Sequence, residues 1–413
     1  MPAVLYTLTS DLHGELAKTA SGEPFIKDIE AAMGEPFIIR NGDYSDIGTH
    51  PLELIYVRTG GTEGIFRSLF EKDGTLVIPE PVRLLTSGRS NSLAASMEIL
   101  SYLNQHGIKG EILHGSPGRI AEKIGEPSFN PAKCSKVREI SPSGKILEGK
   151  RLGVVGRPSD WLISSDVDYA AAKASLGVEL IDVPMEELLG EIKAGGHPQV
   201  SLPALNVPKF GNPIPESDLE GALEIYGALK RIISKYELNG LTLRCFDLLT
   251  AVHNTGCMAL ALLNAEGFTA TCEGDVPAML TMAVSSAVCG ISGFQANLSK
   301  AEGDSLLFAH CTVPLGMVRG WVYDTHFESG FGVAVHGELL EGPATIFKIA
   351  PDFKTALIAE AVLDHNQYEG MLCRTQIVMD APGLKDYFLC QPIGNHHVII
   401  PGRQAKKLYK ALI

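Results

Sequence analysis

The chain has 413 residues, of which 45% are hydrophobic and 20% charged, and its formal net charge is −13 at pH 7. This composition is typical of a globular protein, and the length predicts two or three domains rather than one core. The acidic balance argues against nucleic acids and anionic membranes as partners, because both attract basic surfaces.

The start of the sequence lacks a basic segment followed by an apolar run, so we expect no signal peptide. No segment offers the roughly 20 uninterrupted apolar residues that a membrane span requires. The eight cysteines are scattered and include no Cys-x-x-Cys pair. In a chain of this length that pattern predicts reduced thiols rather than a disulfide framework, and therefore a cytoplasmic protein.

Residues 1–150 alternate strand and helix signals and form the first predicted domain. A predicted strand at 52–57 runs into Arg58-Thr-Gly-Gly-Thr-Glu63, and another at 82–86 leads through Asn91 into a helix. The adjacent glycines allow a close backbone approach to a ligand, but their spacing is not that of a dinucleotide fingerprint. Asn91 either caps the helix or reaches a ligand across an interface.

A stretch rich in proline and serine at 126–150 predicts a domain boundary. The strand at 151–155 then begins a second domain, and the loop after it carries Trp161, which either packs at a domain edge or stacks on a ligand. Strands and helices continue to alternate, which implies a mainly parallel sheet with helices on both faces. We place this domain at 151–305.

The second domain continues with a long amphipathic helix and a strand at 241–245 that is followed by Asp247. Glu273-Gly274-Asp275 then stands where another strand ends and the next helix begins. In open α/β sheets this edge binds ligands, and two carboxylates around a flexible glycine can turn toward one cation. The simpler alternative is that Asp275 caps the helix and Glu273 is solvated.

From residue 306 onward the pattern changes to short strands with glycine turns, which predicts an antiparallel β domain, such as a small barrel, at 306–413. His310 ends one predicted strand, and His396-His397 stand in a Gly-Asn-His-His loop. Imidazoles combined with a carboxylate suit Mn²⁺, Fe²⁺, Co²⁺ or Zn²⁺. Single histidines are usually structural, so a metal site requires the fold to bring these residues to Glu273.

Several short motifs follow one another along the chain: Arg58-Thr-Gly-Gly-Thr-Glu63, Asn91-Ser-Leu-Ala-Ala95, Pro158-Ser-Asp-Trp-Leu162, Leu263-Asn-Ala-Glu-Gly267, Cys272-Glu-Gly-Asp275, Ala309-His-Cys311, Cys373-Arg-Thr-Gln376 and Gly394-Asn-His-His397. This ordered set resembles the L-fucose isomerase/L-arabinose isomerase superfamily, especially its shorter fucose isomerase-like members. The resemblance implies two Rossmann-like, doubly wound α/β domains and a C-terminal β domain, assembled as a homo-oligomer (trimer or hexamer). It also implies that the first domain reaches a neighbour's active site.

The same resemblance implies aldose–ketose interconversion with a divalent metal, typically Mn²⁺, on Glu273, His310 and His396. Counting from Gly394 instead favours His397 as the ligand. Ion pairs are the alternative role for the two arginines among the substrate-binding candidates, which are Arg58, Asn91, Trp161, Asp247, Arg374 and His397.

One position departs from the family pattern. Where fucose isomerases carry an aspartate that is both ligand and acid/base partner, an ungapped alignment places Asn297. An amide oxygen can coordinate a cation, but it cannot carry a proton in this pH range. Asn297 is therefore a candidate metal ligand, and Asp275, Asp247 or a bound water is left as the partner acid.

The sequence thus predicts a metal-dependent isomerase that acts on a small sugar or modified sugar through an enediolate. Glu273 moves the proton between carbons, with Asp275 as its catalytic partner. Two alternatives stay open. One is a sugar-binding or regulatory protein that has kept the fold and lost turnover, and the other is a metal-dependent lyase or epimerase that uses the same intermediate.

Overall fold

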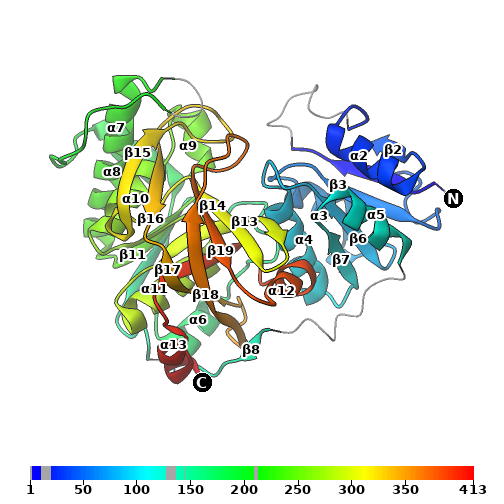
Figure 1. Cartoon of the computed structure of the whole chain (residues 1–413). Coiled ribbons are helices and arrows are strands. Elements are labelled where there is room, and N and C mark those ends of the chain that lie inside the picture. Colours follow the sequence, from blue (N-terminus) through cyan, green and yellow to red (C-terminus); the bar gives the residue numbers. More distant parts are fainter. Residues whose placement is uncertain (1, 11–19, 127–135, 144, 209–212) are drawn as a thin grey trace.

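The computed structural model describes residues 2–10, 20–126, 136–143, 145–208 and 213–413. Within these ranges the chain forms two parallel β-sheets with helices packed on them, and a closed antiparallel β-barrel (Figure 1). The N-terminal sheet lies to one side, in blue and cyan, while the second sheet and the barrel pack together on the other side.

The first sheet has the strand order β2-β1-β3-β6-β7, and all its neighbours are parallel. Successive residues of β1 face opposite sides of the sheet, so Leu5 and Tyr6 are buried in two different cores beneath two different helix pairs. The elements are β1 (Val4–Leu8), β2 (Ile38–Asn41), β3 (Glu53–Val57), β6 (Val82–Thr86), β7 (Gly110–Leu113), α2 (Pro24–Met33), α3 (Glu63–Phe70), α4 (Ser92–Gln105) and α5 (Pro117–Gly125), with a small hairpin of β4 (Glu71–Lys72) and β5 (Thr75–Leu76) after α3.

The second sheet has the order β10-β9-β11-β12 and is also parallel throughout. Its buried faces pack on helices from both sides, as the alternation of strand and helix signals predicts. The elements are β9 (Arg151–Val155), β10 (Glu179–Val183), β11 (Gly240–Leu243), β12 (Thr269–Cys272), α6 (Tyr169–Leu176), α7 (Met185–Ala194), α8 (Glu216–Tyr236), α9 (Phe246–Ala251), α10 (Cys257–Ala265) and α11 (Val276–Cys289).

Six strands close the C-terminal barrel in the order β17-β20-β13-β14-β19-β18, and β18 pairs back to β17. Every pair is antiparallel, so the predicted antiparallel barrel is confirmed. The strands are β13 (Phe294–Glu302), β14 (Ser305–His310), β17 (Gly342–Ile349), β18 (Thr355–Asn366), β19 (Thr375–Asp380) and β20 (His396–Pro401); around them lie β8 (Arg138–Glu139), the hairpin β15 (Val318–Asp324) and β16 (Ala334–Leu339), and the helices α12 (Lys385–Cys390) and α13 (Ala405–Leu412).

The barrel begins at Phe294 and not at residue 306, which corrects the predicted boundary. Phe294, Ala296 and Leu298 are buried in the core, and polar residues alternate with them along β13. This alternation is the ordinary pattern of a strand with one apolar face.

Two helices connect the barrel to the parallel sheets. Helix α4 is buried from Ser92 to Leu103 and packs against β7 on one side and β13 on the other. Helix α11 packs against β12 as well as against β17 and β20. Helices that are buried all round carry apolar residues on every face. No helix in the described ranges combines the length and the apolar character that crossing a membrane requires.

Glu98 on α4 joins three parts of the chain through one buried carboxylate. Its Oε1 accepts hydrogen bonds from the Ser164 backbone N–H (2.7 Å) and the Ser165 hydroxyl (3.0 Å), and its Oε2 accepts one from the Asn395 N–H (3.0 Å). Burial raises the pKa of Glu98. Because Asn395 directly precedes His396, this carboxylate anchors the start of β20 to the first and second domains.

We predict that the junction between the first domain and the barrel is sensitive to acid through His114. Its Nδ1 lies 2.7 Å from the Thr86 hydroxyl, and its Nε2 accepts the Ala301 N–H at 3.2 Å, so the ring must be neutral. Burial lowers its pKa to about 3. An unfolded histidine has a pKa of roughly 6.5, so the stabilising contribution is present above that pH and is lost as the pH falls toward the folded value.

The test compares thermal unfolding midpoints of wild type and His114→Gln between pH 7.5 and pH 4. Because the amide does not titrate, the variant should gain stability relative to wild type as the pH falls. A difference between the two proteins that is the same at both pH values would contradict the prediction.

Candidate functional site

The carboxyl ends of both parallel sheets border a cavity of about 360 Å³ at one end of the barrel. Its wall includes Gly60 from the first domain, Trp161 and Glu273 from the second, and Asn297 and His310 from the barrel. Small-molecule sites commonly measure roughly 300–1,000 Å³. All these residues belong to one chain, so the cavity has a wall from its own first domain.

A larger cleft, of about 910 Å³, lies between the first domain and the turn before β18, where Lys109 and Asp352 face it. None of the predicted site residues lines it. Size alone favours this cleft, but buried titratable groups gather in the smaller cavity, and functional sites are where such groups collect. We therefore assign the candidate site to the smaller cavity.

Glu273 stands in a tight turn directly after β12. Both Glu273 (φ 65°) and Gly274 (φ 66°) have left-handed backbones, and a side chain on Gly274 would lie 2.5 Å from the Arg157 carbonyl oxygen. The Gln295 side chain of β13 accepts the Cys272 N–H at 2.8 Å. A non-glycine residue in this conformation costs about 1–3 kcal/mol and persists only where the surroundings impose it. The turn thus directs Glu273 toward the barrel.

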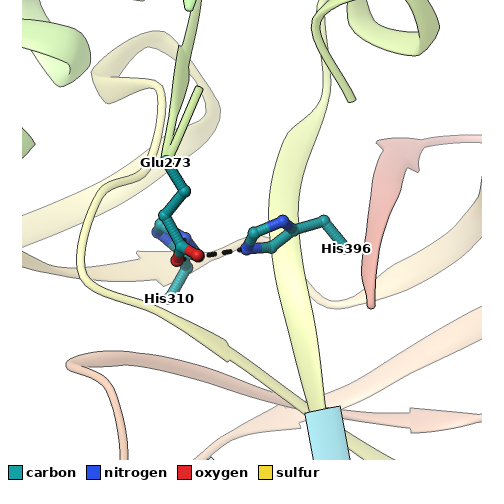
Figure 2. Close-up of side chains that lie close together, drawn as sticks. All are labelled: Glu273, His310 and His396. Atoms are coloured by element: carbon teal, nitrogen blue, oxygen red, sulfur yellow. Dashed lines mark ion pairs between the residues drawn. The ribbon is translucent and has the colours of Figure 1, made fainter. Parts of the chain in front are cut away.

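Three side chains from separate segments lie close together beside the cavity, and Glu273 and His310 also line it (Figure 2). The Glu273 Oε1 lies 3.3 Å from the His396 Nε2 and 3.7 Å from the His310 Nε2. One potential ligand atom from each of the three residues lies within 4.8 Å of those of the other two. The structure therefore brings together the carboxylate and the two histidines that the sequence predicts as metal ligands.

Asp275 orients His396 from behind. Its Oδ2 lies 2.9 Å from the His396 Nδ1, and its Oδ1 accepts the Ala278 N–H at 2.6 Å as the N-cap of α11. A carboxylate at Nδ1 holds the proton there and leaves Nε2 free to bind a metal. Asp275 is fully buried and does not line the cavity. The predicted cap is confirmed, whereas the predicted role of Asp275 as partner acid is wrong.

The carboxylates and histidines at this site stabilise one another in their charged forms. Burial alone would raise the pKa of Glu273, but the His396 and His310 side chains lower it well below its ordinary range. Burial alone would lower the pKa of His396, but Glu273 and Asp275 raise it to about 9. The cluster therefore provides a strong negative potential that a proton on His396 partly neutralises. Cation binding would release that proton.

Asn297 is a fourth candidate metal ligand beside Glu273, His310 and His396. It lies on β13 directly opposite His396 on β20, lines the cavity, and is 4% exposed. Its Oδ1 makes no hydrogen bond within the described part of the chain. An unpaired buried carbonyl oxygen is costly unless a ligand satisfies it. Two imidazoles, a carboxylate and an amide oxygen fit a divalent first-row metal.

Two predicted substrate-binding residues do line the cavity. The Trp161 Nε1 donates a hydrogen bond to the Glu273 Oε2 at 2.8 Å, and its ring packs edge-on against Phe246. Asp247 also lines the cavity and accepts a hydrogen bond from the Arg244 Nε at 2.9 Å. Trp161 therefore fixes the orientation of the Glu273 carboxylate. Asp247 adds another carboxyl group to the cavity wall.

Two predicted arginines do not line the cavity. Arg58 pairs with Glu23, to which its Nε donates at 2.6 Å. The Arg374 Nε donates to the Thr325 carbonyl oxygen at 2.6 Å and lies 3.4 Å from Asp324. The alternative of an ion pair thus holds for both, and the prediction that they bind substrate is corrected. Arg374 instead braces the loop between β15 and β16.

His397 is also excluded from the cavity. It is fully buried, and its Nε2 lies 2.8 Å from the Tyr387 hydroxyl. Burial lowers its pKa to about 3. Because neighbouring residues of a strand face opposite sides, His396 and His397 cannot both reach Glu273. His396 is the candidate ligand, and the prediction that His397 contacts substrate is wrong.

Asn91 occupies the N-cap position of α4 without capping it. It has a left-handed backbone (φ 56°), and its Nδ2 donates a hydrogen bond to the Glu328 Oε1 at 2.8 Å. Both residues line the cavity. Asn91 therefore faces the cavity, where it holds a carboxyl group of the same chain's loop between β15 and β16.

Two glutamates and one histidine of the cavity were not predicted as site residues: Glu63, Glu328 and His326. Glu63 is 2% exposed, and burial raises its pKa well above the ordinary range. Burial lowers the pKa of His326 to about 4 and raises that of Glu328 to about 7. Glu63 ends the Arg58–Glu63 motif and so carried a sequence signal. His326 and Glu328 lie in a loop with no distinguishing pattern.

The sequences of known proteins provide no assignment, since no family model and no curated protein matches this chain. The function is therefore argued from the geometry of the site.

We predict that the purified protein binds one divalent first-row metal ion at this cluster, and that Glu273→Gln and His396→Ala lose stoichiometric binding after reconstitution with Mn²⁺. Each variant removes one of the three converging metal-ligand side chains. Asp247→Asn is the matched control, since it lines the same cavity outside the cluster and should retain the metal. Metal content by elemental analysis is the readout. Equal metal in all four proteins would place the ion elsewhere.

We also predict that Asp275→Asn weakens metal binding by about 10–100-fold without abolishing it, as is usual when the group orienting a metal-bound histidine is lost. Asparagine remains a good helix cap, so α11 should stay intact. Competition with a chelator measures the affinity, and circular dichroism checks the fold. Unchanged affinity would show that Asp275 does not orient His396.

Proposed function

We propose that this protein is a metal-dependent aldose–ketose isomerase related to the L-fucose and L-arabinose isomerases. The observation that carries this proposal is the convergence of Glu273, His310 and His396 beside a cavity that Glu273 and His310 line, at the positions where the resemblance predicts metal ligands. The orphaned Oδ1 of Asn297 beside them supports it, because a cation would satisfy that atom.

The proposal extends to the architecture and setting. Both parallel sheets begin with the strand order 2-1-3-4 and are covered by helices, which supports Rossmann-like domains. Their carboxyl edges border the cavity, as ligand-binding edges do in such folds. We further propose a cytoplasmic homo-oligomer, a trimer or hexamer, although each cavity already has its first-domain wall from its own chain.

Glu273, His310, His396 and Asn297 would hold the metal, which would stabilise negative charge on neighbouring oxygens of an open-chain sugar. Glu273 is the base that takes the proton from the carbon beside the carbonyl group and returns it to the adjoining carbon. Trp161 fixes the carboxylate through its N–H, and Asp275 fixes the His396 ring. These contacts preorganise the site before substrate enters.

The cavity favours an uncharged sugar. Glu63, Asp247 and Glu328 face it together with Glu273, and the two arginines proposed to hold an anion are engaged elsewhere. Carboxyl groups accept and donate hydrogen bonds to hydroxyls, and no arginine or lysine of the described residues lines the cavity to bind a phosphate or carboxylate group. We therefore propose a neutral polyhydroxy aldehyde or ketone as substrate.

We predict that the Mn²⁺-loaded protein, incubated in D₂O with neutral pentoses, hexoses and deoxysugars, converts at least one sugar and exchanges its carbon-bound proton. Glu273→Gln should do neither. Nuclear magnetic resonance reads both events in one sample. Exchange with cleavage of the sugar would favour a lyase. A sugar that raises the unfolding temperature without exchange would favour a binding protein, for which the amide at Asn297 is the supporting observation.

A further inference from the structure

The proposed reaction requires a second proton-transfer group besides Glu273. Moving a carbonyl group between neighbouring carbons moves one proton between carbons and another between oxygens. Glu273 serves the carbons. Asn297 cannot carry a proton, and Asp275 lies behind His396 with both oxygens engaged and no contact with the cavity.

Three carboxyl groups outside the metal cluster face the same cavity, those of Glu63, Asp247 and Glu328. Asp247 is already paired with Arg244, whose Nε donates to it at 2.9 Å, so Glu63 and Glu328 are the remaining candidates. Glu328 comes from the loop between β15 and β16, and Glu63 from the first turn of α3. Glu273 lies near enough to both that its charge contributes to the upward shift of their pKa values, although burial is the larger cause. Either group is thus close to the candidate metal centre without belonging to it.

Glu328 is held in a defined position. Asn91 donates a hydrogen bond to its Oε1 at 2.8 Å from the first domain. Gly60 leaves room for the same carboxyl group, since a side chain there would lie 3.4 Å from that Oε1 and 3.0 Å from the Asn91 Cβ. Arg374 braces the base of the loop through Thr325. With Asn91 bound to the carboxyl group and Arg374 bound to the loop, Glu328 keeps one geometry relative to the substrate.

We propose that Glu328 is the catalytic residue that moves the proton between the two substrate oxygens, an inference that rests on the proposed isomerase function. As Glu273 removes the proton from C2, the Glu328 carboxyl group donates its proton to O1, which gives the enediol. Glu328 then accepts the proton from O2, and Glu273 returns its proton to C1. The aldose has become the ketose, both side chains are restored, and no oxidant or reductant is consumed.

The protonation behaviour of Glu328 suits this shuttle. Burial raises its pKa to about 7, so it can both donate and accept near neutral pH. Glu63 has its pKa raised well above the ordinary range and is suited only to donating a hydrogen bond. The charged and titratable groups that interact with Glu328 are Glu273, Cys311, Cys373 and Glu63, and Asn91 is its polar contact.

The test uses the full-length Mn²⁺-loaded protein with Glu328→Gln and Glu328→Asp. Glutamine keeps an acceptor for Asn91 but cannot carry a proton, whereas aspartate keeps the acid on a shorter side chain. We expect Glu328→Gln to lower kcat for isomerisation by about 10²–10⁴-fold, the usual contribution of a general acid, and Glu328→Asp to recover part of the loss. Metal affinity should change less than about twofold, because Glu328 lies outside the donor set.

Two further readouts separate proton transfer from a structural role. Wild-type activity should fall as the pH rises through the pKa of Glu328, because the protonated form that donates is lost. The residual activity of Glu328→Gln should not show this fall with rising pH. Carbon-bound exchange in D₂O should be reduced less than net isomerisation in that variant, because Glu273 still removes the proton.

The outcomes distinguish this inference from the proposed function. Wild-type isomerisation with equal kcat in Glu328→Gln overturns the shuttle and leaves the isomerase intact. Loss of metal from Glu328→Gln also overturns the shuttle, because Glu328 would then be needed for metal binding rather than for proton transfer. Wild-type protein that holds metal but neither converts nor exchanges any sugar overturns both.

Discussion

The contact between Asp275 and His396 is the interaction on which the rest of the site depends. One buried carboxylate caps α11 and fixes an imidazole of β20 at 2.9 Å. Because α11 packs between the second sheet and the barrel, this contact sets the position of the helix, the strand and the candidate metal centre together. A carboxylate with both oxygens occupied has little freedom to move, so the Nε2 of His396 is aimed at Glu273 by the fold itself.

The electrostatics explain how so many acidic groups can share a buried space. Isolated buried carboxylates are strongly disfavoured, and the usual remedies are a counter-charge or protonation. Both remedies are present. Glu273 is paired with His396 and His310, whereas Glu63 and Glu328 have raised pKa values. The cavity is thus divided into a charged half suited to a cation and a half whose carboxyl groups can be neutral.

Local sequence patterns were sufficient to find Glu273, since the end of a strand before a helix is a short-range feature. The choice between His396 and His397 was not local. Which of two adjacent residues faces the site depends on the register of β20 against β13. The predicted β domain began at residue 306, after β13, so the register between β13 and β20 lay outside the prediction. The overall class of fold required only the alternation of elements and was predicted.

The misassigned arginines and the missed Glu328 have a common physical cause. Arg58 and Arg374 have long side chains whose partners lie on other elements, so their sequence neighbours say little about where they point. Glu328 faces the cavity because a loop of the C-terminal half meets Asn91 of the first domain. Contacts between such distant segments exist only in the assembled chain, and nothing in the spacing of residues along the sequence encodes them.

Helix α4 has a consequence for how the chain can be divided. Its residues from Ser92 to Leu103 are buried against both the first sheet and the barrel. An isolated first domain would expose the barrel-facing side of this helix to water, and apolar patches of that kind promote aggregation. It would also leave Glu98 without the donors that surround its carboxylate. The first domain is therefore a poor candidate for separate expression, because α4 is fully covered only when β13 of the barrel is in place.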